Sequence, residues 1–247
     1  MGRAKDIIVK VIPSKAANDF VKKNHYSGKV VQNSKLHFGC FLDGKLHGVM
    51  SYGFPIDKRK MLGLVSTDNK TEQSKWNEFL ELNRMAFDDY LPKYSESRAI
   101  SVSFKLIKKN APQIKYIISF ADSTQCGDGT IYRASGFKLT MIKKNTDLYL
   151  LPNGEVKHSM TIKTNKKIIS KYGSCKKYLE KEHKGFSPIN GFQLRYIYLI
   201  DKKSTFNCKI LPFSEIDKQG AGMYKGEKIT LQERRALSDE VDSNSNS

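Results

Sequence analysis

Apolar and polar positions in the first half of the chain alternate in patterns that predict strands and helices in turn. Residues 6–12, "DIIVKVI", are typical of a strand, and residues 13–28 have the helical spacing of apolar positions. Residues 35–55 form two strand-like runs around an Asp-Gly pair, which favours the positive φ angles of a tight hairpin turn. The N-terminal part therefore predicts a strand, a helix and a hairpin in that order.

The following segments continue this alternation. Residues 79–87, "FLELNRMAF", have a periodicity that fits either a strand or part of a helix, whereas residues 95–112 predict a helix with a serine cap. Residues 114–122, "IKYIISFAD", are a continuous apolar run of the kind found in buried parallel strands. Residues 129–137, "GTIYRASGF", predict a short helix that ends at a glycine, and strand-like residues follow it.

This order of elements predicts an α/β fold with a mixed central sheet and helices on both of its faces. We expect residues 1–150 to form the core domain. Residues 151–213 are expected to form a basic extension packed on that core, with strand-like runs at 159–164 and 192–201 and a lysine-rich helix between them. Residues 214–247 are mostly polar, and we expect them to be largely disordered.

The charge of the chain changes the picture from an ordinary α/β domain to one with a polyanionic partner. The net charge is +18, and residues 143–184 alone hold eleven lysines against four acids. Large positive fields are best suited to neutralising phosphates, so nucleic acid is the favoured partner over a lysine-rich surface that is merely solvated. The candidate phosphate contacts are Lys163, Lys166, Lys167, Lys171, Lys176 and Lys177, with Arg195 on the strand that follows.

Other compositional features exclude several classes of protein. The four cysteines form no C-x-x-C pair, and the Cys and His spacings match no structural zinc site. No apolar run approaches the ~18–20 residues that span a bilayer, and no secretory segment opens the sequence. We therefore expect a cytoplasmic protein with reduced cysteines and no membrane partner. The sequence leaves open whether it is a monomer or a homodimer.

Five segments carry a resemblance to a known family, and their shared order is more specific than any one of them. They are "NHYSGK", "FGCFLDGKLHGVMSYG", "ELNRMAF", "SESRAIS" and "FADSTQCGDGTIYRASGF". Together with the basic stretch and the strand "LRYIYL", they make residues 6–200 resemble the GNAT acyltransferase fold and, more narrowly, the phage Mom family of DNA-modifying proteins.

The resemblance implies a transferase that adds a carbamoylmethyl group to N6 of adenine in the double-stranded DNA of a phage. Such a bulky group spoils the reading of adenine in the major groove and so protects the DNA from restriction enzymes of the bacterial host. Two other readings stay open. One is an N-acetyltransferase that acts on another amine, and the other is a basic DNA-binding protein without catalysis.

The family pattern of a strand-end aspartate and a helix tyrosine matches Asp122 and Tyr132. A carboxylate of raised pKa could take the proton from adenine N6, and a tyrosine could protonate the leaving group. The alternatives are that Asp122 caps the following helix and that Tyr132 only packs. Glu81 inside an apolar strand is a further catalytic candidate, and Arg84 is either its ion-pair partner or a contact to substrate.

Residues after the first helix and on the hairpin complete the candidate acceptor site. His25 is a further catalytic candidate there, although a lone histidine at such a place is more often a hydrogen-bonded surface residue. Tyr26, next to it, is a candidate substrate contact, and Tyr52 is a candidate stacking partner for a base, with coverage of the sheet as the alternative. His25 and Asp122 together could also supply the nitrogen and oxygen ligands that iron accepts.

The expected cofactor is acyl-CoA or another acyl or aminoacyl carrier. GNAT enzymes hold the pyrophosphate of CoA on a glycine-rich loop, but here the corresponding residues are "YSESRAIS", without glycine. Ser95, Ser97 and Arg98, together with the free amides at this helix N-terminus, are the candidate residues for an anionic donor.

Overall fold

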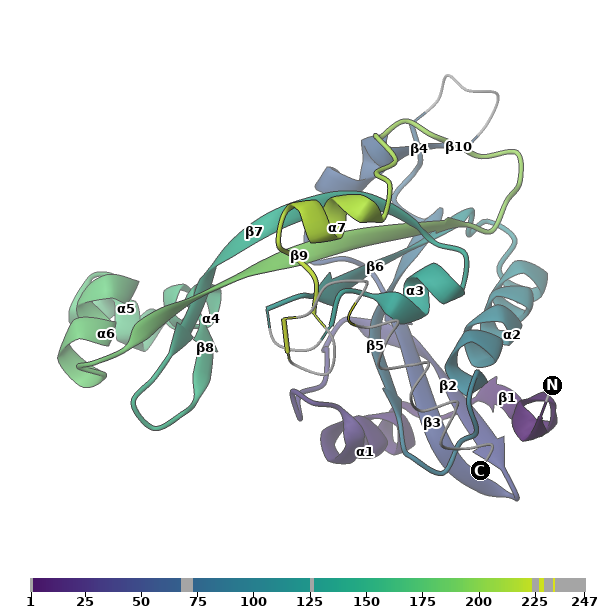
Figure 1. Cartoon of the computed structure of the whole chain (residues 1–247), viewed down its shortest axis with the longest axis horizontal. Helices are drawn as coiled ribbons and strands as arrows, with labels where there is room; N and C mark the ends of the chain where they lie inside the picture. Colours follow the sequence, from purple (N-terminus) through teal and green to yellow (C-terminus); the bar gives the residue numbers. More distant parts are fainter. Residues whose placement is uncertain (1, 68–72, 125–126, 224–226, 229–232, 234–247) are drawn as a thin grey trace. The chain divides into compact units, whose positions relative to one another are not determined.

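A computed structural model describes residues 2–67, 73–124, 127–223, 227–228 and 233 (Figure 1). The strands are β1 Ile8–Val11, β2 Ser34–Leu42, β3 Lys45–Gly53, β4 Val65–Ser66, β5 Phe79–Phe87, β6 Tyr116–Asp122, β7 Lys138–Leu150, β8 Val156–His158, β9 Ser187–Leu199 and β10 Thr205–Phe206. The helices are η1 Arg3–Asp6, α1 Ser14–Asn24, η2 Lys58–Leu64, α2 Ser95–Asn110, α3 Thr130–Ala134, α4 Ser159–Lys163, α5 Lys166–Tyr172, α6 Cys175–Glu182 and α7 Ser214–Lys218.

The main sheet has eight strands in the order β1-β2-β3-β5-β6-β9-β7-β8. Strands β1, β2, β3 and β5 are antiparallel neighbours, whereas β5 and β6 are parallel. A sheet with both kinds of pairing and with helices packed on it confirms the expected mixed α/β fold. Residues 79–87, whose periodicity was ambiguous, form a strand because they pair with β3 along most of their length.

The hairpin between β2 and β3 turns at the predicted residues. Asp43 has φ of 50° and Gly44 has φ of 76°, the left-handed values that a two-residue turn between twisted strands requires. The two strands then pair from Leu42 and Lys45 outward, with β1 added on the other edge of β2. This hairpin fixes the register of β3 and, through it, of β5.

The parallel pair of β5 and β6 stays together for only three residue pairs, which end at Glu81 and Ile118. Both strands continue beyond this point, so their backbones part there. The hydroxyl of Ser119 on β6 donates a 2.8 Å hydrogen bond to the carbonyl oxygen of Leu82 on β5, where the ladder has already ended. The side chain thus satisfies a backbone acceptor that the separation of the strands leaves open.

The chain divides into two compact units. The first contains residues 1–121, 129–141 and 194–215, and the second contains residues 122–128, 142–193 and 216–247. Strands β7 and β9 contribute residues to both. The expected division into 1–150, 151–213 and 214–247 remains a prediction, and much of the last segment lies outside the described residues.

Two clusters of buried apolar side chains lie among the described residues of the first unit. One packs α1 against the sheet through Ala17 and Val21 with Val49 and Ala86. The other gathers Phe79, Tyr116 and their neighbours on the central strands. These clusters fix the central strands and therefore the end of the β5–β6 ladder at Glu81.

The second unit has its own small core. Leu151, Ile162, Cys175 and Leu179 are buried together, and Tyr149 packs against them. The helices α4, α5 and α6 surround this core. The expectation of a strand at 159–164 was wrong, because residues 159–163 form α4. The apolar positions of residues 159–164 alternate over too few residues to distinguish a strand from a single helical turn that buries Ile162.

In the part of the chain that the structure describes, no helix is long and apolar enough to cross a membrane.

Candidate functional site

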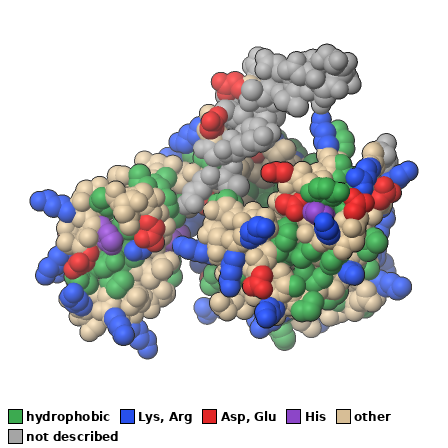
Figure 2. Space-filling view, turned by 90° about the horizontal axis from the view of Figure 1, so that it is seen from below, with side chains coloured by type: hydrophobic (Ala, Val, Ile, Leu, Met, Phe, Trp, Pro, Cys, Tyr) green, Lys and Arg blue, Asp and Glu red, His purple; other side chains and the backbone are tan. Residues whose placement is uncertain are grey.

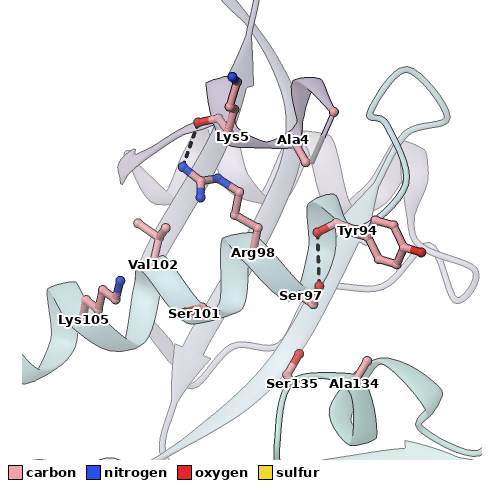
Figure 3. Close-up of a pocket in the computed structure, with 11 residues that line it drawn as sticks. Ala4, Lys5, Tyr94, Ser97, Arg98, Ser101, Val102, Lys105, Ala134 and Ser135 are labelled. Carbon is pink, nitrogen blue, oxygen red and sulfur yellow. Dashed lines mark hydrogen bonds between the residues drawn. The ribbon is translucent and has the colours of Figure 1, made fainter.

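A cavity of about 480 Å³ opens in the first unit beside the N-terminal half of α2 (Figure 3). Its lining residues come from the chain start, from α2 and from the end of α3; they are Gly2, Ala4, Lys5, Tyr94, Ser97, Arg98, Ser101, Val102, Lys105, Ala134 and Ser135. Lys5, Arg98 and Lys105 give the lining three cationic side chains. The described lining has no acid, so the cavity suits an anionic group.

Two buried polar atoms of this cavity have no hydrogen-bond partner among the described residues. They are the Nε of Arg98 and the Oγ of Ser135. The Nη2 of Arg98 donates a 2.7 Å hydrogen bond to the carbonyl oxygen of Lys5, which holds the guanidinium in place (Figure 3). Buried polar groups are rarely left unpaired in folded proteins, so these two atoms mark places where a ligand oxygen would be accommodated.

The three residues predicted to bind a cofactor differ in their surroundings. Ser97 and Arg98 line the cavity. Ser95 is buried, and its hydroxyl donates to the carbonyl oxygen of Pro92, so it is engaged in the entry to the helix. The hydroxyl of Ser97 donates to the carbonyl oxygen of Tyr94 at 3.1 Å.

Tyr94 stands at the N-cap of α2 with φ of 72° and makes no side-chain cap hydrogen bond. A non-glycine residue in the left-handed region is strained, and a glycine would take up this conformation freely. The side chain is exposed and lines the cavity. An aromatic ring therefore stands where the glycine-free segment 94–101 enters α2, and it does so in a strained backbone conformation.

Glu81, Arg84 and His25 form an electrostatic cluster in the first unit. Burial raises the pKa of Glu81 to about 7, against the opposing effect of the Arg84 guanidinium. Burial lowers the pKa of His25 to about 4, and the positive charge of Arg84 contributes in the same direction. Near neutral pH the histidine is therefore neutral, whereas Glu81 is poised between its acid and its carboxylate.

A β-bulge at Asn83 explains how Glu81 and Arg84 interact. In the register with β3, Ser51 pairs with Arg84 and Tyr52 pairs with Leu82, so Asn83 has no opposite residue. Side chains three positions apart point to opposite faces of a regular strand, and a bulge changes this alternation. Arg84 is held by its Nε, which donates to the carbonyl oxygen of Lys29 at 2.9 Å.

The predicted pair Asp122 and Tyr132 is divided between the two units. One carboxylate oxygen of Asp122 accepts the backbone N–H of Thr124 at 2.9 Å. It does not cap the following helix, because the N-cap of α3 is Gly129. The ring of Tyr132 lies 5.3 Å from the rings of both Phe137 and Tyr196, measured between centroids, and is half-buried.

The two tyrosines predicted to contact the substrate differ in exposure. Tyr26 is 54% exposed, and its ring lies 4.3 Å from that of His25. Tyr52 is fully buried, with its hydroxyl bonded to Ser103 at 2.6 Å, so its ring covers the sheet and offers no face to a base. Apolar alternation could not reveal this, because β3 is buried on both faces.

The predicted phosphate-binding lysines gather on the helices of the second unit, where Figure 2 shows basic side chains around the rim. All six are exposed; they are Lys163, Lys166, Lys167, Lys171, Lys176 and Lys177. Three of them have acidic partners at 3.7–3.9 Å, namely Asp147, Glu182 and Glu180. A shallow pocket of about 400 Å³ is lined by Lys171, Tyr172, Lys177, Glu180 and Lys181.

Arg195 does not share the exposure of these lysines. Its Nε donates to the Oγ1 of Thr140 at 3.0 Å, and burial lowers its pKa. This arginine is held against its own sheet.

The suggested iron site has no support. Among the described residues, no group of three or more His, Cys, Asp or Glu side chains is placed to hold a metal. The Nδ1 of His25 accepts the backbone N–H of Ser27 at 3.1 Å and contacts its hydroxyl at 2.8 Å.

Sequence reasoning missed Lys5, Lys105 and Ser135 as lining residues of the cavity. Lys105 carried a local signal, because it follows Arg98 by seven residues and shares its face of the helix. Lys5 and Ser135 carried none, since only the packing of the chain start and of α3 beside α2 brings them there.

Comparisons with known proteins give one family. A family model described as the Mom protein family matches residues 6–215. The methylcarbamoylase mom of Escherichia phage Mu is 33% identical over 204 residues, which cover 81% of this chain and 78% of that protein.

Solved structures of several acetyltransferases resemble the fold. A probable acetyltransferase from Staphylococcus epidermidis ATCC 12228 is 11% identical with a TM-score of 0.44, over 78% of this chain and 98% of that chain. The ribosomal-protein-S18-alanine N-acetyltransferase from Escherichia coli is 9% identical with a TM-score of 0.42, over 79% of this chain and 94% of that chain.

Proposed function

Because the chain belongs to the Mom protein family, we propose that it is a DNA-modifying transferase that adds a carbamoylmethyl-type group to N6 of adenine in double-stranded DNA. The modification would protect phage DNA from restriction, since a group on the exocyclic amine blocks a hydrogen-bond donor that identifies adenine in the major groove.

The observation that carries the chemistry is Glu81. Its pKa of about 7 matches the requirement for a general base, which must be ionised at the working pH and still basic enough to accept a proton. In the proposed step, N6 forms a new bond to the carbon of the transferred group and releases a proton to the Glu81 carboxylate. The bond between that carbon and its carrier breaks, and the electron pair stays with the carrier.

Asp122 and Tyr132, the pair predicted from the sequence, keep proposed roles. Tyr132 would give its hydroxyl proton to the leaving group. Electrostatic interaction with Tyr132 is also among the smaller causes that raise the pKa of Tyr52. Asp122 is a rival to Glu81 for the role of base. The pH dependence of the reaction tests Glu81 in this role, because burial raises its pKa to about 7.

The donor would bind in the cavity beside α2. Arg98 and Ser135 supply unpaired polar atoms there, and Lys5 and Lys105 add positive charge. These residues fit the phosphates of a CoA-type carrier, which would supply the activated group. The carrier phosphates would replace the glycine-loop contacts of acetyltransferases with contacts to side chains.

The lysines of the second unit would hold the DNA by its phosphates. An adenine N6 in duplex DNA is engaged in base pairing, so we propose that the base is extruded from the stack before the reaction.

Replacing Tyr94 by glycine tests the donor site. We expect the melting temperature not to fall, because glycine removes the left-handed strain. We expect the affinity for coenzyme A to fall about tenfold, because a wall of stacking aromatic surface is lost. Calorimetric titration with coenzyme A measures the second effect. Tyr94→Phe keeps the ring and should bind as the wild type does; equal affinity in all three proteins would remove Tyr94 from the donor site.

Mass spectrometry of nucleosides tests the function itself. The protein is produced in bacteria, plasmid DNA is digested, and deoxyadenosine-derived species are compared among wild type, Glu81→Gln and Asp122→Ala. A new adenine adduct in the wild type would identify the transferred group by its mass. Loss of the adduct in Glu81→Gln alone supports Glu81 as base, whereas DNA that wild-type protein leaves unchanged contradicts the proposal.

A further inference from the structure

The loop that leaves β3 exposes an isoleucine almost completely. Ile56 is 97% exposed, far more than any other large apolar side chain in the described part of the chain. It lies between Pro55, which is buried, and Asp57, at a bend of the backbone. Single apolar side chains are often exposed on protein surfaces, so the exposure of Ile56 becomes informative only through the residues around it.

The loop stands on an aromatic base. The rings of Phe54 and Trp76 have centroids 6.0 Å apart, and the Nζ of Lys58 lies 4.5 Å from the first centroid and 5.2 Å from the second. Asn33 donates its side-chain N–H to the carbonyl oxygen of Phe54. Trp76 is itself 58% exposed. These contacts hold the root of the loop while Ile56 projects from it.

Cations follow the apolar tip at once. Lys58, Arg59 and Lys60 begin η2, and Asp57 is the one acid in this run. Its carboxylate lies 3.0 Å from Lys60 and 4.0 Å from Arg59. An apolar tip with a cationic flank is complementary to duplex DNA, in which stacked bases lie between two rows of phosphates.

The loop begins beside Glu81, the proposed general base. Gly53, the last residue of β3, pairs with Glu81 of β5, and Phe54 is the next residue. Consecutive Cα atoms are about 3.8 Å apart, so Ile56 is only three residues along the chain from the partner of Glu81. The tip is thus close enough in the chain to act at the base pair whose adenine meets Glu81.

We propose that Ile56 is the wedge that enters the DNA stack when the target adenine is extruded, with Trp76 as a neighbouring stacking surface and Lys58, Arg59 and Lys60 on the adjoining phosphates. The inference rests on the proposed function. Apolar side chains are known to be inserted between base steps, and filling the gap offsets the cost of unstacking. Single-stranded DNA needs no such wedge.

The test compares one DNA in two forms. Mixed-sequence DNA, native or heat-denatured, is incubated with wild type, Ile56→Ala and Ile56→Leu, and adenine adducts are counted by mass spectrometry. We expect Ile56→Ala to lose about tenfold on native DNA and less than about twofold on denatured DNA, because only the duplex must be unstacked. Ile56→Leu should recover most of the loss. Ile210→Ala removes another exposed isoleucine of the same unit and should change neither rate.

Equal rates of wild type and Ile56→Ala on both forms would overturn the proposal, and so would an equal loss on both. If the wild type modifies neither native nor denatured DNA, or only native DNA, a binding measurement decides instead. Duplexes with 2-aminopurine in place of adenine become fluorescent when the base leaves the stack. A rise with wild type that Ile56→Ala lacks supports the wedge even if the proposed transfer fails, and a rise that is the same for both proteins, or absent from both, contradicts it.

Discussion

Replacing Glu81 by glutamine is expected to lower the rate of DNA modification by about 10²- to 10⁴-fold, the usual contribution of a general base. Glutamine has nearly the same shape as protonated glutamic acid but cannot accept the proton of N6. DNA affinity should change little, because the proposed phosphate contacts are made by lysines and arginine and not by Glu81. Single-turnover modification and a binding titration, done side by side, measure the two quantities. Asp89→Asn, which removes an exposed acid just beyond β5, is the matched control.

The pH dependence gives a second, independent readout of the same residue. The folded pKa of Glu81 is about 7 against an ordinary value of 4.5, so folding favours the protonated form. The stability that this form provides is complete below pH 4.5 and is lost as the pH rises through about 7. Activity should rise over the upper part of the range from pH 4.5 to about 7, while the free energy of unfolding falls.

Glu81→Gln should therefore melt at a higher temperature than wild type at pH 8 and at nearly the same temperature at pH 4. A wild-type rate with no inflection near pH 7 would contradict Glu81 as the base. So would a Glu81→Gln variant that retains full activity.

Removing four lysines from α5 and α6 is expected to have the largest effect on DNA binding. In the variant, Lys166, Lys167, Lys176 and Lys177 become glutamine, and the net charge falls from +18 to +14. Each phosphate contact contributes about 0.9 to the slope of log affinity against log salt, so the slope should decrease in magnitude by about 3 to 4. We expect about 100-fold weaker binding at physiological salt.

The matched control removes the same charge from other helices. Lys22, Lys23, Lys108 and Lys109 are exposed in the last turns of α1 and α2, and their replacement by glutamine also gives +14. A salt titration of duplex binding compares the two variants. If both lose the same slope, the overall field of the protein attracts the DNA, and the assignment to α5 and α6 is wrong.

The sequence predicted elements wherever a local signal decides them. The turn at Asp43-Gly44 and the helix end at Gly136, with φ of 83°, depend on backbone conformations that few residues accept. Pairing partners decided the other cases. The segment 79–87 is a strand because β3 and β6 flank it, and 159–163 is a helix because Ile162 enters a core that other helices supply.

The candidate site was predictable in part for the same reason. Ser97 and Arg98 were found because a helix N-terminus is a local feature that suits anions. The pKa of Glu81 depends on its burial and on Arg84. A β-bulge at Asn83, which no sequence pattern predicts, allows Glu81 and Arg84 to interact. Tyr52 shows the reverse error, because an aromatic residue in a strand covered on both faces has the same pattern as one that is half-exposed.

The small core of Leu151, Ile162, Cys175 and Leu179 has a consequence for how such proteins diverge. Exposed side chains of α5 and α6, which this core supports, can change without disturbing the buried residues around Glu81. The surface residues of the second unit and the residues around Glu81 are then free to accumulate substitutions at different rates.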